Sequence, residues 1–428
     1  MNNNLEYNKL HKTKDGNKYI IVENNHNQLC YVEVLIDRGS LYDVKGKEGI
    51  HHFLEHLIAK GSIKISGEEY NNKMSYYGAV HNAYTEFNET AFMVSSLSEN
   101  IVEVTDLLID SITSPIFLYD DRYKNEFFEE ERNIILDEFN MYNSPESKAN
   151  SKLINTVYGD TSDTNYVIGT EDSLAAISYD DIVNAYMQYN KEDITLIINV
   201  HIDDKNITDD VLNTIINNYN DKFNMFQDKS EIVREKKVYK PVVYTGYIKG
   251  LPYTVVSRYY GIKVTKKEVY TIIPNYVSLL QQILFNEIRE KLGLCYYVMV
   301  QTFSSDDPNE RIIAISSASE KPEIVLKLID DIINNIDRYI TEDMFIGSSR
   351  RLRRDIIESD RQNLLYYKVF RKLYNEDFDN DKFLEGLKKY STRGHLNEFI
   401  NKLDLSNKSV IVLNRSDETG CEDEEREG

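Results

Sequence analysis

The sequence predicts an α+β fold in which two structurally similar α/β-sandwich domains are joined by a linker. With 428 residues, the chain is long enough for two or three domains. One order of elements, a strand pair, a helix, a second strand pair, several helices and a final strand, occurs twice along it. A polar, charge-mixed stretch at 227–240 separates the two occurrences. Because the halves share little residue identity, the predicted duplication rests on this order alone.

The composition excludes some classes of partner. The net charge is −21, so the surface is not suited to binding the phosphates of nucleic acid, although an acidic cavity would attract cationic peptides. No run of 18 apolar residues is present, so we expect no membrane span. The three cysteines are widely spaced and odd in number, and the N-terminus lacks an apolar signal region. We therefore expect a protein of the cytoplasm.

The first predicted domain covers residues 1–225. Its strands are short apolar or alternating segments, and its helices place apolar residues three and four positions apart. We predict strands at 19–23, 29–36, 80–85, 89–97 and 194–202, and helices around His52 and at about 66–76, 98–113, 119–142, 179–190 and 208–223.

After a linker at 226–241, the second predicted domain covers residues 242–414. Its first long helix begins near Pro274 and ends at Gly293, as Pro and Gly tend to flank helices. The acidic tail, 415–428, is expected to be disordered. We predict strands at 242–249, 254–264, 295–303, 310–317 and 409–413, and helices at 274–291, 321–338, 342–375 and 380–402.

The stretch from Gly49 to Leu57 carries the strongest chemical signal. On a helix, His52 and His56 lie one turn apart on one face, and Glu55 shares that face. Two imidazoles at this spacing can chelate one Zn²⁺, and the glutamate can take a proton from a zinc-bound water. His-x-x-Glu-His is the signature of inverzincins. The alternative is a chance pattern of surface histidines beside a solvated carboxylate.

Two histidines leave a zinc site incomplete, and the predicted helix at 119–142 offers further ligands. Glu131 and Glu138 are seven residues apart (138 − 131 = 7), on a face that is otherwise apolar. Burying two carboxylates there is costly unless a metal neutralises one and a ligand histidine bonds to the other. The alternative is that both carboxylates reach solvent at the edge of the helix.

These residues resemble the pitrilysin/insulysin family of zinc peptidases, family M16. The stretch Gly49–Ser62 is similar to the first family motif, and Glu131–Glu138 is similar to the second. The resemblance implies that Glu138 is the third zinc ligand and that Glu131 orients a ligand. His51 departs from the family, which has a small residue at that position.

Two weaker matches concern the substrate. The stretch Gly78–Thr85 resembles the family strand that lies beside the bound peptide, and an edge strand there would pair with an extended substrate. The matching residues are Asn82, Ala83, Tyr84 and Thr85. In the second half, Arg289 and Tyr296 resemble the family's substrate-anchoring pair, whose donors could stabilise a developing oxyanion. Without the resemblance, they would be a helix-terminal cation and a core aromatic.

The resemblance implies a zinc-dependent endopeptidase with one Zn²⁺ per chain, held by His52, His56 and Glu138, with Glu55 activating the water. The length is typical of half-size members, in which two chains, as a homodimer or heterodimer, enclose a chamber for peptides or unfolded segments. Two alternatives stay open. One is a non-catalytic peptide-binding subunit of a heterodimer, and the other is a dedicated maturation protease for one small peptide.

Overall fold

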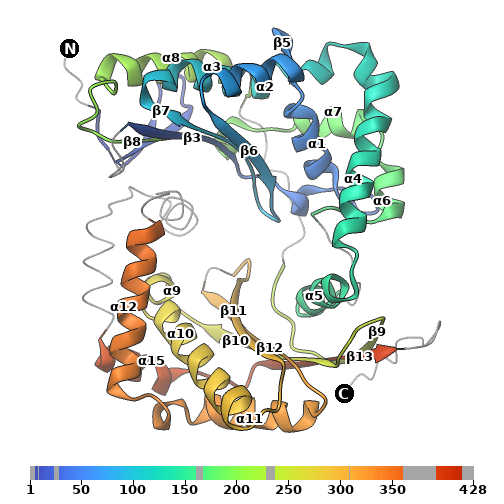
Figure 1. The fold of residues 1–428 in the computed structure, drawn as a ribbon, viewed down its shortest axis with the longest axis vertical. Coiled ribbons are helices and arrows are strands. Elements are labelled where there is room, and N and C mark those ends of the chain that lie inside the picture. The colour runs from blue at the N-terminus through green and yellow to red at the C-terminus, as the bar shows by residue number, and fades with distance from the viewer. Residues whose placement is uncertain are drawn as a thin grey trace. The chain divides into compact units, whose positions relative to one another are not determined.

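The computed structural model describes residues 5–7, 9–23, 28–160, 167–227, 237–307, 309–359 and 392–416. It divides into two compact units (Figure 1). Of the described residues, the first unit contains 5–142, 167–227 and Ser359, and the second contains 143–160, 237–358 and 392–416. Each unit is described by itself below.

The first unit is built on a six-stranded sheet with the order β1-β2-β8-β3-β7-β6. The pair β2/β8 is parallel and the other pairs are antiparallel. All seven residues of β8 are buried, which suits its β-branched sequence and its place inside the sheet. The strands are β1 (Leu10–Lys12), β2 (Lys18–Glu23), β3 (Leu29–Ile36), β6 (Val80–Thr85), β7 (Thr90–Leu97) and β8 (Ile194–Val200), with a separate small pair, β4 (Gly61–Ser62) and β5 (Ile65–Ser66).

The helices of this unit bury one apolar face each in a single core that also includes the sheet. The helix α3 packs on β7 and on α8, and α1 packs on α4 and α7. The helices are α1 (Ile50–Ile58), α2 (Gly67–Tyr76), α3 (Ile101–Thr113), a π-helical turn η4 (Tyr123–Phe127) that continues as α4 (Phe128–Tyr142), α6 (Glu171–Ala176), α7 (Tyr179–Met187) and α8 (Asp209–Phe223).

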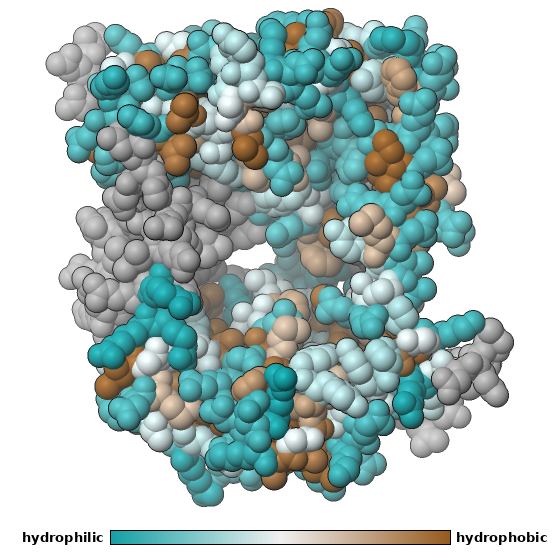
Figure 2. Space-filling view, viewed as in Figure 1, coloured by the Kyte–Doolittle hydropathy of each residue, from teal (hydrophilic) through white to brown (hydrophobic). Residues whose placement is uncertain are grey.

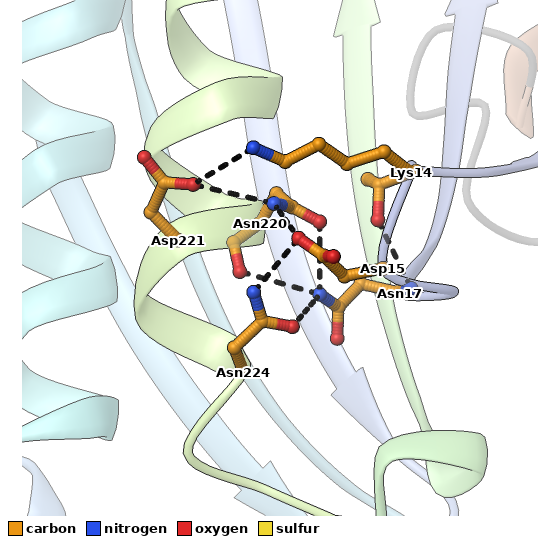
Figure 3. A network of polar contacts seen from close by, with 7 residues as sticks. Lys14, Asp15, Asn17, Asn220, Asp221 and Asn224 are labelled. Atoms are coloured by element: carbon orange, nitrogen blue, oxygen red, sulfur yellow. Dashed lines mark hydrogen bonds and ion pairs between the residues drawn. The ribbon is translucent and has the colours of Figure 1, made fainter.

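A polar network fastens the first hairpin of this unit to the end of α8 (Figure 3). The amides of Asn220 and Asn224 donate to one oxygen of Asp15 at 2.6 and 2.9 Å. Asn17, which is buried, donates to the side-chain oxygens of both asparagines at 3.2 Å. Buried amides need such partners, so the network holds the turn before β2 in one position.

The second unit has a five-stranded sheet with the order β11-β12-β10-β13-β9. The pair β13/β9 is parallel and the others are antiparallel. Its strands are β9 (Val243–Lys249), β10 (Val255–Lys263), β11 (Tyr297–Ser304), β12 (Glu310–Ala318) and β13 (Lys408–Ser416). Its helices are α5 (Pro145–Thr156), α9 (Lys266–Thr271), α10 (Ile273–Leu284) with a π-helical continuation η6 (Phe285–Lys291), α11 (Pro322–Asn334), α12 (Glu342–Ser359) and α15 (Arg393–Lys402).

The two sheets have the same topology, which confirms the predicted duplication. In chain order, β2, β3, β6, β7 and β8 correspond to β9, β10, β11, β12 and β13. The orders β2-β8-β3-β7-β6 and β9-β13-β10-β12-β11 then match strand for strand, including the one parallel pair in each. The strand β1 is an addition at one edge of the first sheet.

The structure differs from the predicted division in one helix. The sequence prediction placed residues 1–225 in the first domain and no helix at 145–156, whereas α5 forms there and residues 143–160 group with the second unit. The reason is packing, because Ala149 and Leu153 lie in one cluster with Tyr244 and Leu413 of the second sheet.

The predicted linker and tail are also shorter in the structure. Phe226 packs in the core of the first unit and Tyr239 in that of the second, so both ends of the linker 226–241 are fixed, while 228–236 lie outside the described residues. The strand β13 extends to Ser416, because Arg415 and Ser416 still pair with β9. The rest of the predicted tail, 417–428, and the predicted helical segments at 360–391 also lie outside the described residues.

The surface is mainly polar where it can be seen. On the face shown in Figure 2, the described side chains are mostly hydrophilic, and hydrophobic ones are scattered singly or in small groups. Within the ranges that the structure describes, no helix has the length and hydropathy needed to cross a bilayer.

Candidate metal centre

The helix α1 starts at a point where the backbone requires glycine. Gly49 has φ = 102°, and a side chain at Gly49 would meet the carbonyl oxygen of Ile168 at 2.4 Å. The buried carboxylate of Asp43 accepts hydrogen bonds from the backbone N–H groups of Gly49 (2.7 Å) and His51 (3.1 Å). It also contacts Nδ1 of His51 at 2.5 Å. Asp43 therefore caps the helix from outside it and neutralises its dipole end.

The helix α4 is held against α1 by aromatic and cationic contacts. The rings of Phe53 and Phe128 stack at 4.7 Å, and the guanidinium of Arg132 lies 4.9 Å from the Phe128 ring. Arg132 also donates to the carbonyl oxygens of Leu174 and Ile177, so it ties α4 to the C-terminal end of α6. These contacts fix the face of α4 that carries Glu131 and Glu138.

His52, His56 and Glu138 come together at the junction of the two helices. Their ligand atoms all lie within 4.8 Å of one another. Nε2 of His52 is 3.6 Å, and Nε2 of His56 3.5 Å, from the same oxygen of Glu138. Ligand atoms about 2.0–2.2 Å from a tetrahedral zinc lie about 3.3–3.6 Å apart. The donor set, two imidazoles and one carboxylate, thus fits zinc in both chemistry and spacing.

Glu131 is bonded to one of these histidines. Its Oε1 is 2.8 Å from Nδ1 of His56, so this nitrogen donates its proton and leaves Nε2 free to bind a metal. Only 3% of Glu131 is exposed, which excludes the alternative that both carboxylates of this helix reach solvent. Burial raises the pKa of Glu131, but hydrogen bonds from His56 and Lys60 outweigh it, so the pKa is lowered.

The two histidines have opposite pKa shifts. Burial, followed by the charge of His56, lowers the pKa of His52 to about 3, so its imidazole is neutral and able to bind a metal. Burial also acts to lower the pKa of His56, but the hydrogen bond to Glu131 and the surrounding carboxylates raise it. At Nε2 of His56, a metal and a proton compete for the same lone pair.

Glu55 lies beside the donor set without belonging to it. Its Oε2 accepts a hydrogen bond of 2.6 Å from the hydroxyl of Thr85 at the end of β6. Burial raises its pKa to about 6, although the Thr85 hydrogen bond acts in the opposite direction. A carboxylate with such a pKa is a suitable general base near neutral pH.

A cavity of about 790 Å³ opens beside Glu55 and His56. Asn82 and Ala83 of β6 line one side of it, and Tyr70 and Phe127 line others. The strand β6 lies at the edge of the sheet, and in the described part of the chain it pairs with β7 alone. An extended peptide could add to this edge next to the donor set.

The residues predicted to touch substrate in β6 differ in their surroundings. Asn82 is exposed, and Ala83 is partly buried. Tyr84 donates to Glu89 at 3.3 Å. Thr85 is buried and bonded to Glu55, so its side chain supports the candidate base.

Arg289 and Tyr296 belong to the second unit. Arg289 is exposed on η6, with its guanidinium 4.9 Å from the ring of Phe285. Tyr296 is 59% exposed and stacks on Tyr253, with the ring centroids 5.5 Å apart. This exposure excludes the alternative that Tyr296 is a core aromatic. Both side chains present their polar ends at the surface of their unit.

Three supporting contacts were not predicted from the sequence. They are the bond from Thr85 to Glu55, the pair of Asp43 with His51, and the ion pair of Lys60 with Glu131 at 2.6 Å. The ion pair of Lys60 with Glu131 had a signal in the sequence argument, because a buried carboxylate that bonds one histidine has a second oxygen that needs a partner.

Comparisons with known proteins bear on this geometry. Residues 19–171 match the sequence model of a family described as insulinase, peptidase family M16. A Rickettsia felis protein named as an uncharacterized zinc protease is 24% identical over 353 residues, which are 81% of this chain and 82% of that protein. Two solved structures share the fold with a TM-score of 0.75 and 16% identity, over 95% of this chain and 98% of theirs. They are a protease from Helicobacter pylori and an inactive M16 peptidase domain from Pseudomonas fluorescens.

Proposed function

Because residues 19–171 match the sequence model of peptidase family M16, we propose that this chain is a zinc-dependent endopeptidase that cleaves peptides or unfolded segments. The observation that carries the proposal is the convergence of His52, His56 and Glu138, with Glu55 beside them. The name of the Rickettsia relative as a zinc protease supports the choice of metal.

In this proposal, His52, His56 and Glu138 hold one Zn²⁺ through Nε2, Nε2 and a carboxylate oxygen. The ion supplies Lewis-acid chemistry when bound, polarising a carbonyl oxygen and making a water more acidic. Glu131 keeps Nδ1 of His56 protonated and thereby keeps Nε2 available as a ligand.

Glu55 performs the proton transfers. As a carboxylate it accepts a proton from the attacking water, and as an acid it then gives that proton to the leaving amine. The Thr85 hydroxyl holds one oxygen, Oε2, so the proton is carried by the other oxygen, Oε1. The backbone of Asn82–Thr85 pairs with the extended substrate and holds it beside the donor set.

Arg289 and Tyr296 complete the proposal. Their donors hold the substrate carbonyl and stabilise the negative charge that develops on it in the transition state. We further propose that two M16-like chains, as a homodimer or a heterodimer, enclose the substrate. The cytoplasmic location stays a prediction.

A second candidate is a peptide-binding subunit without activity, which the likeness to an inactive M16 domain brings into consideration. The observation that favours a peptidase is that the donor set, the base and its supporting hydroxyl are all present. A maturation protease for one small peptide would use the same residues and differ only in its substrate.

The variant Glu55→Gln separates these candidates. It removes the base but no ligand, so we expect zinc content to be unchanged and turnover of an unfolded protein or peptide mixture to fall by about 10²–10⁴-fold. Glu99→Gln, an exposed carboxylate in the turn 98–100, is the matched control and should behave as wild type. Equal cleavage by Glu55→Gln and wild type would contradict the assignment, and no cleavage by a zinc-loaded wild type would favour the non-catalytic subunit.

A further inference from the structure

Lys60 follows α1 and reaches back to the metal centre. Its Nζ is 2.6 Å from Oε2 of Glu131, while Oε1 of the same carboxylate bonds Nδ1 of His56. Each oxygen of Glu131 therefore has one partner, and the two partners come from the same short segment of chain, residues 56–60. We infer that Lys60 is a positioning residue, an inference that rests on the proposed zinc site. Lys60 holds Glu131 in place, and Glu131 in turn orients the ligand His56.

The backbone around Lys60 is fixed, so its side chain starts from a defined point. Its N–H donates to the carbonyl oxygen of Leu57 at 3.3 Å at the end of α1. Its own carbonyl oxygen lies against Gly67, where an added side-chain carbon would approach to 2.7 Å. Gly61 follows with φ = 107°. These contacts direct the lysine stem along the cavity wall toward Glu131.

The burial of the two partners distinguishes this pair from a surface ion pair. The side chain of Glu131 is 4% exposed and that of Lys60 is 38% exposed. Exposed pairs contribute little because water screens both charges, whereas a buried carboxylate depends on the partners that it keeps. Lys60 supplies one of the two partners that Glu131 has, so its loss would leave one oxygen of a buried carboxylate unsatisfied.

The charge balance of the site also favours a cation at the position of Lys60. A bound Zn²⁺ and the three carboxylates Glu55, Glu131 and Glu138 together carry a net charge of −1. The ammonium of Lys60 brings the cluster to zero. A neutral cluster is easier to bury than a charged one, so Lys60 allows three acidic side chains to surround one ion.

The two possible effects of removing Lys60 have opposite signs, which makes the inference testable. If Lys60 acted only as a nearby positive charge, its removal would tighten the binding of a cation. If it positions Glu131, its removal lets the carboxylate turn away from His56 and weakens binding. Residues that orient a metal ligand typically change metal affinity by about 10–100-fold, and we expect about tenfold weaker zinc binding for Lys60→Met.

The experiment measures the affinity of the full-length protein for Zn²⁺ by competition with a coloured chelator, together with the melting temperature of the zinc-free protein. Lys60→Met should bind zinc about tenfold more weakly, and Lys60→Arg, which keeps the ion pair, should restore most of the affinity. Lys64→Met is the matched control, because Lys64 is a near neighbour that pairs with Asp110. If zinc-free Lys60→Met has a lower melting temperature than zinc-free wild type, Lys60→Gln replaces it in the affinity measurement.

A double-mutant cycle identifies the route of the effect. In a Glu131→Gln background, Lys60→Met should cause no further loss, because the carboxylate through which it acts is gone. Equal or tighter zinc binding by Lys60→Met, or the same tenfold loss in the Glu131→Gln background, would overturn the inference while leaving the zinc site in place. Absence of zinc binding by wild type would overturn the proposed function and this inference with it.

Discussion

The helix pair α1/α4 of the first unit and the pair α10/α12 of the second occupy corresponding places in the duplicated order of elements, yet they meet through different chemistry. Between α1 and α4, two histidines face two carboxylates. Between α10 and α12, Asn275 donates to Ser349 at 3.1 Å and Arg351 donates to Gln282 at 2.8 Å. Within the described residues, the only group of three side chains suited to a metal is in the first unit.

This difference indicates that the duplicated fold supplies a scaffold and that the function depends on a few side chains placed on it. The second unit fills the same junction with hydrogen bonds that need no metal. Its contribution to catalysis, in our proposal, comes instead from Arg289 and Tyr296, which follow α10 in the chain. In this proposal, the first unit binds the metal and the second supplies the donors that stabilise the transition state.

The largest expected effect tests this division of labour. Arg289→Ala and Tyr296→Phe should each reduce turnover by about 10²–10³-fold, as the loss of an oxyanion donor does in other enzymes. Zinc content should be unchanged, because neither residue lies in the unit that carries the donor set. Steady-state kinetics and elemental analysis on the same preparations measure both quantities.

Lys291→Ala provides the control for these variants. Lys291 is another cation on η6, paired with Glu287 at 2.6 Å, and its removal should leave turnover within a few fold of wild type. Retained activity in Arg289→Ala and Tyr296→Phe would contradict their proposed role in stabilising the transition state.

A smaller effect is expected on local stability when zinc is removed. A ligand at 100 times its Kd stabilises the folded state by about 2.7 kcal/mol. Chelation should therefore speed hydrogen exchange of the amides in α1 and α4 and leave those in α10 and α12 unchanged. Mass spectrometry measures this exchange. An equal increase in the exchange rate in both helix pairs would contradict the conclusion that zinc binds in the first unit and not in the second.

Much of the fold follows from local sequence patterns. The strands at 29–36 and 80–85 were predicted at the bounds that β3 and β6 have, the first from its run of apolar residues and the second from its alternating pattern. The helix α5 was missed, since Ala149 and Leu153 are its residues in the core and only Pro145 and Ile154 of the others are apolar. Ser144, which caps it, and Pro145, its first residue, were the available signals.

The site was predictable where it depends on spacing within one helix. His52 and His56 are one turn apart, and Glu131 and Glu138 are two turns apart, so each pair could be placed on a face from the sequence. The bonds from Thr85 to Glu55 and from Lys60 to Glu131 join residues on different elements. No local pattern encodes such contacts, because they depend on how β6, α1 and α4 pack together.

The central claim is tested most directly by the zinc content of three purified proteins, measured by elemental analysis. Wild type should contain one zinc per chain, because only the first unit offers a donor set among the described residues. Gln282→Ala, at the corresponding helix junction of the second unit, should also contain one, and His56→Ala should contain none while remaining folded. A wild type that takes up no zinc, or a His56→Ala variant that keeps a full equivalent, would contradict the account.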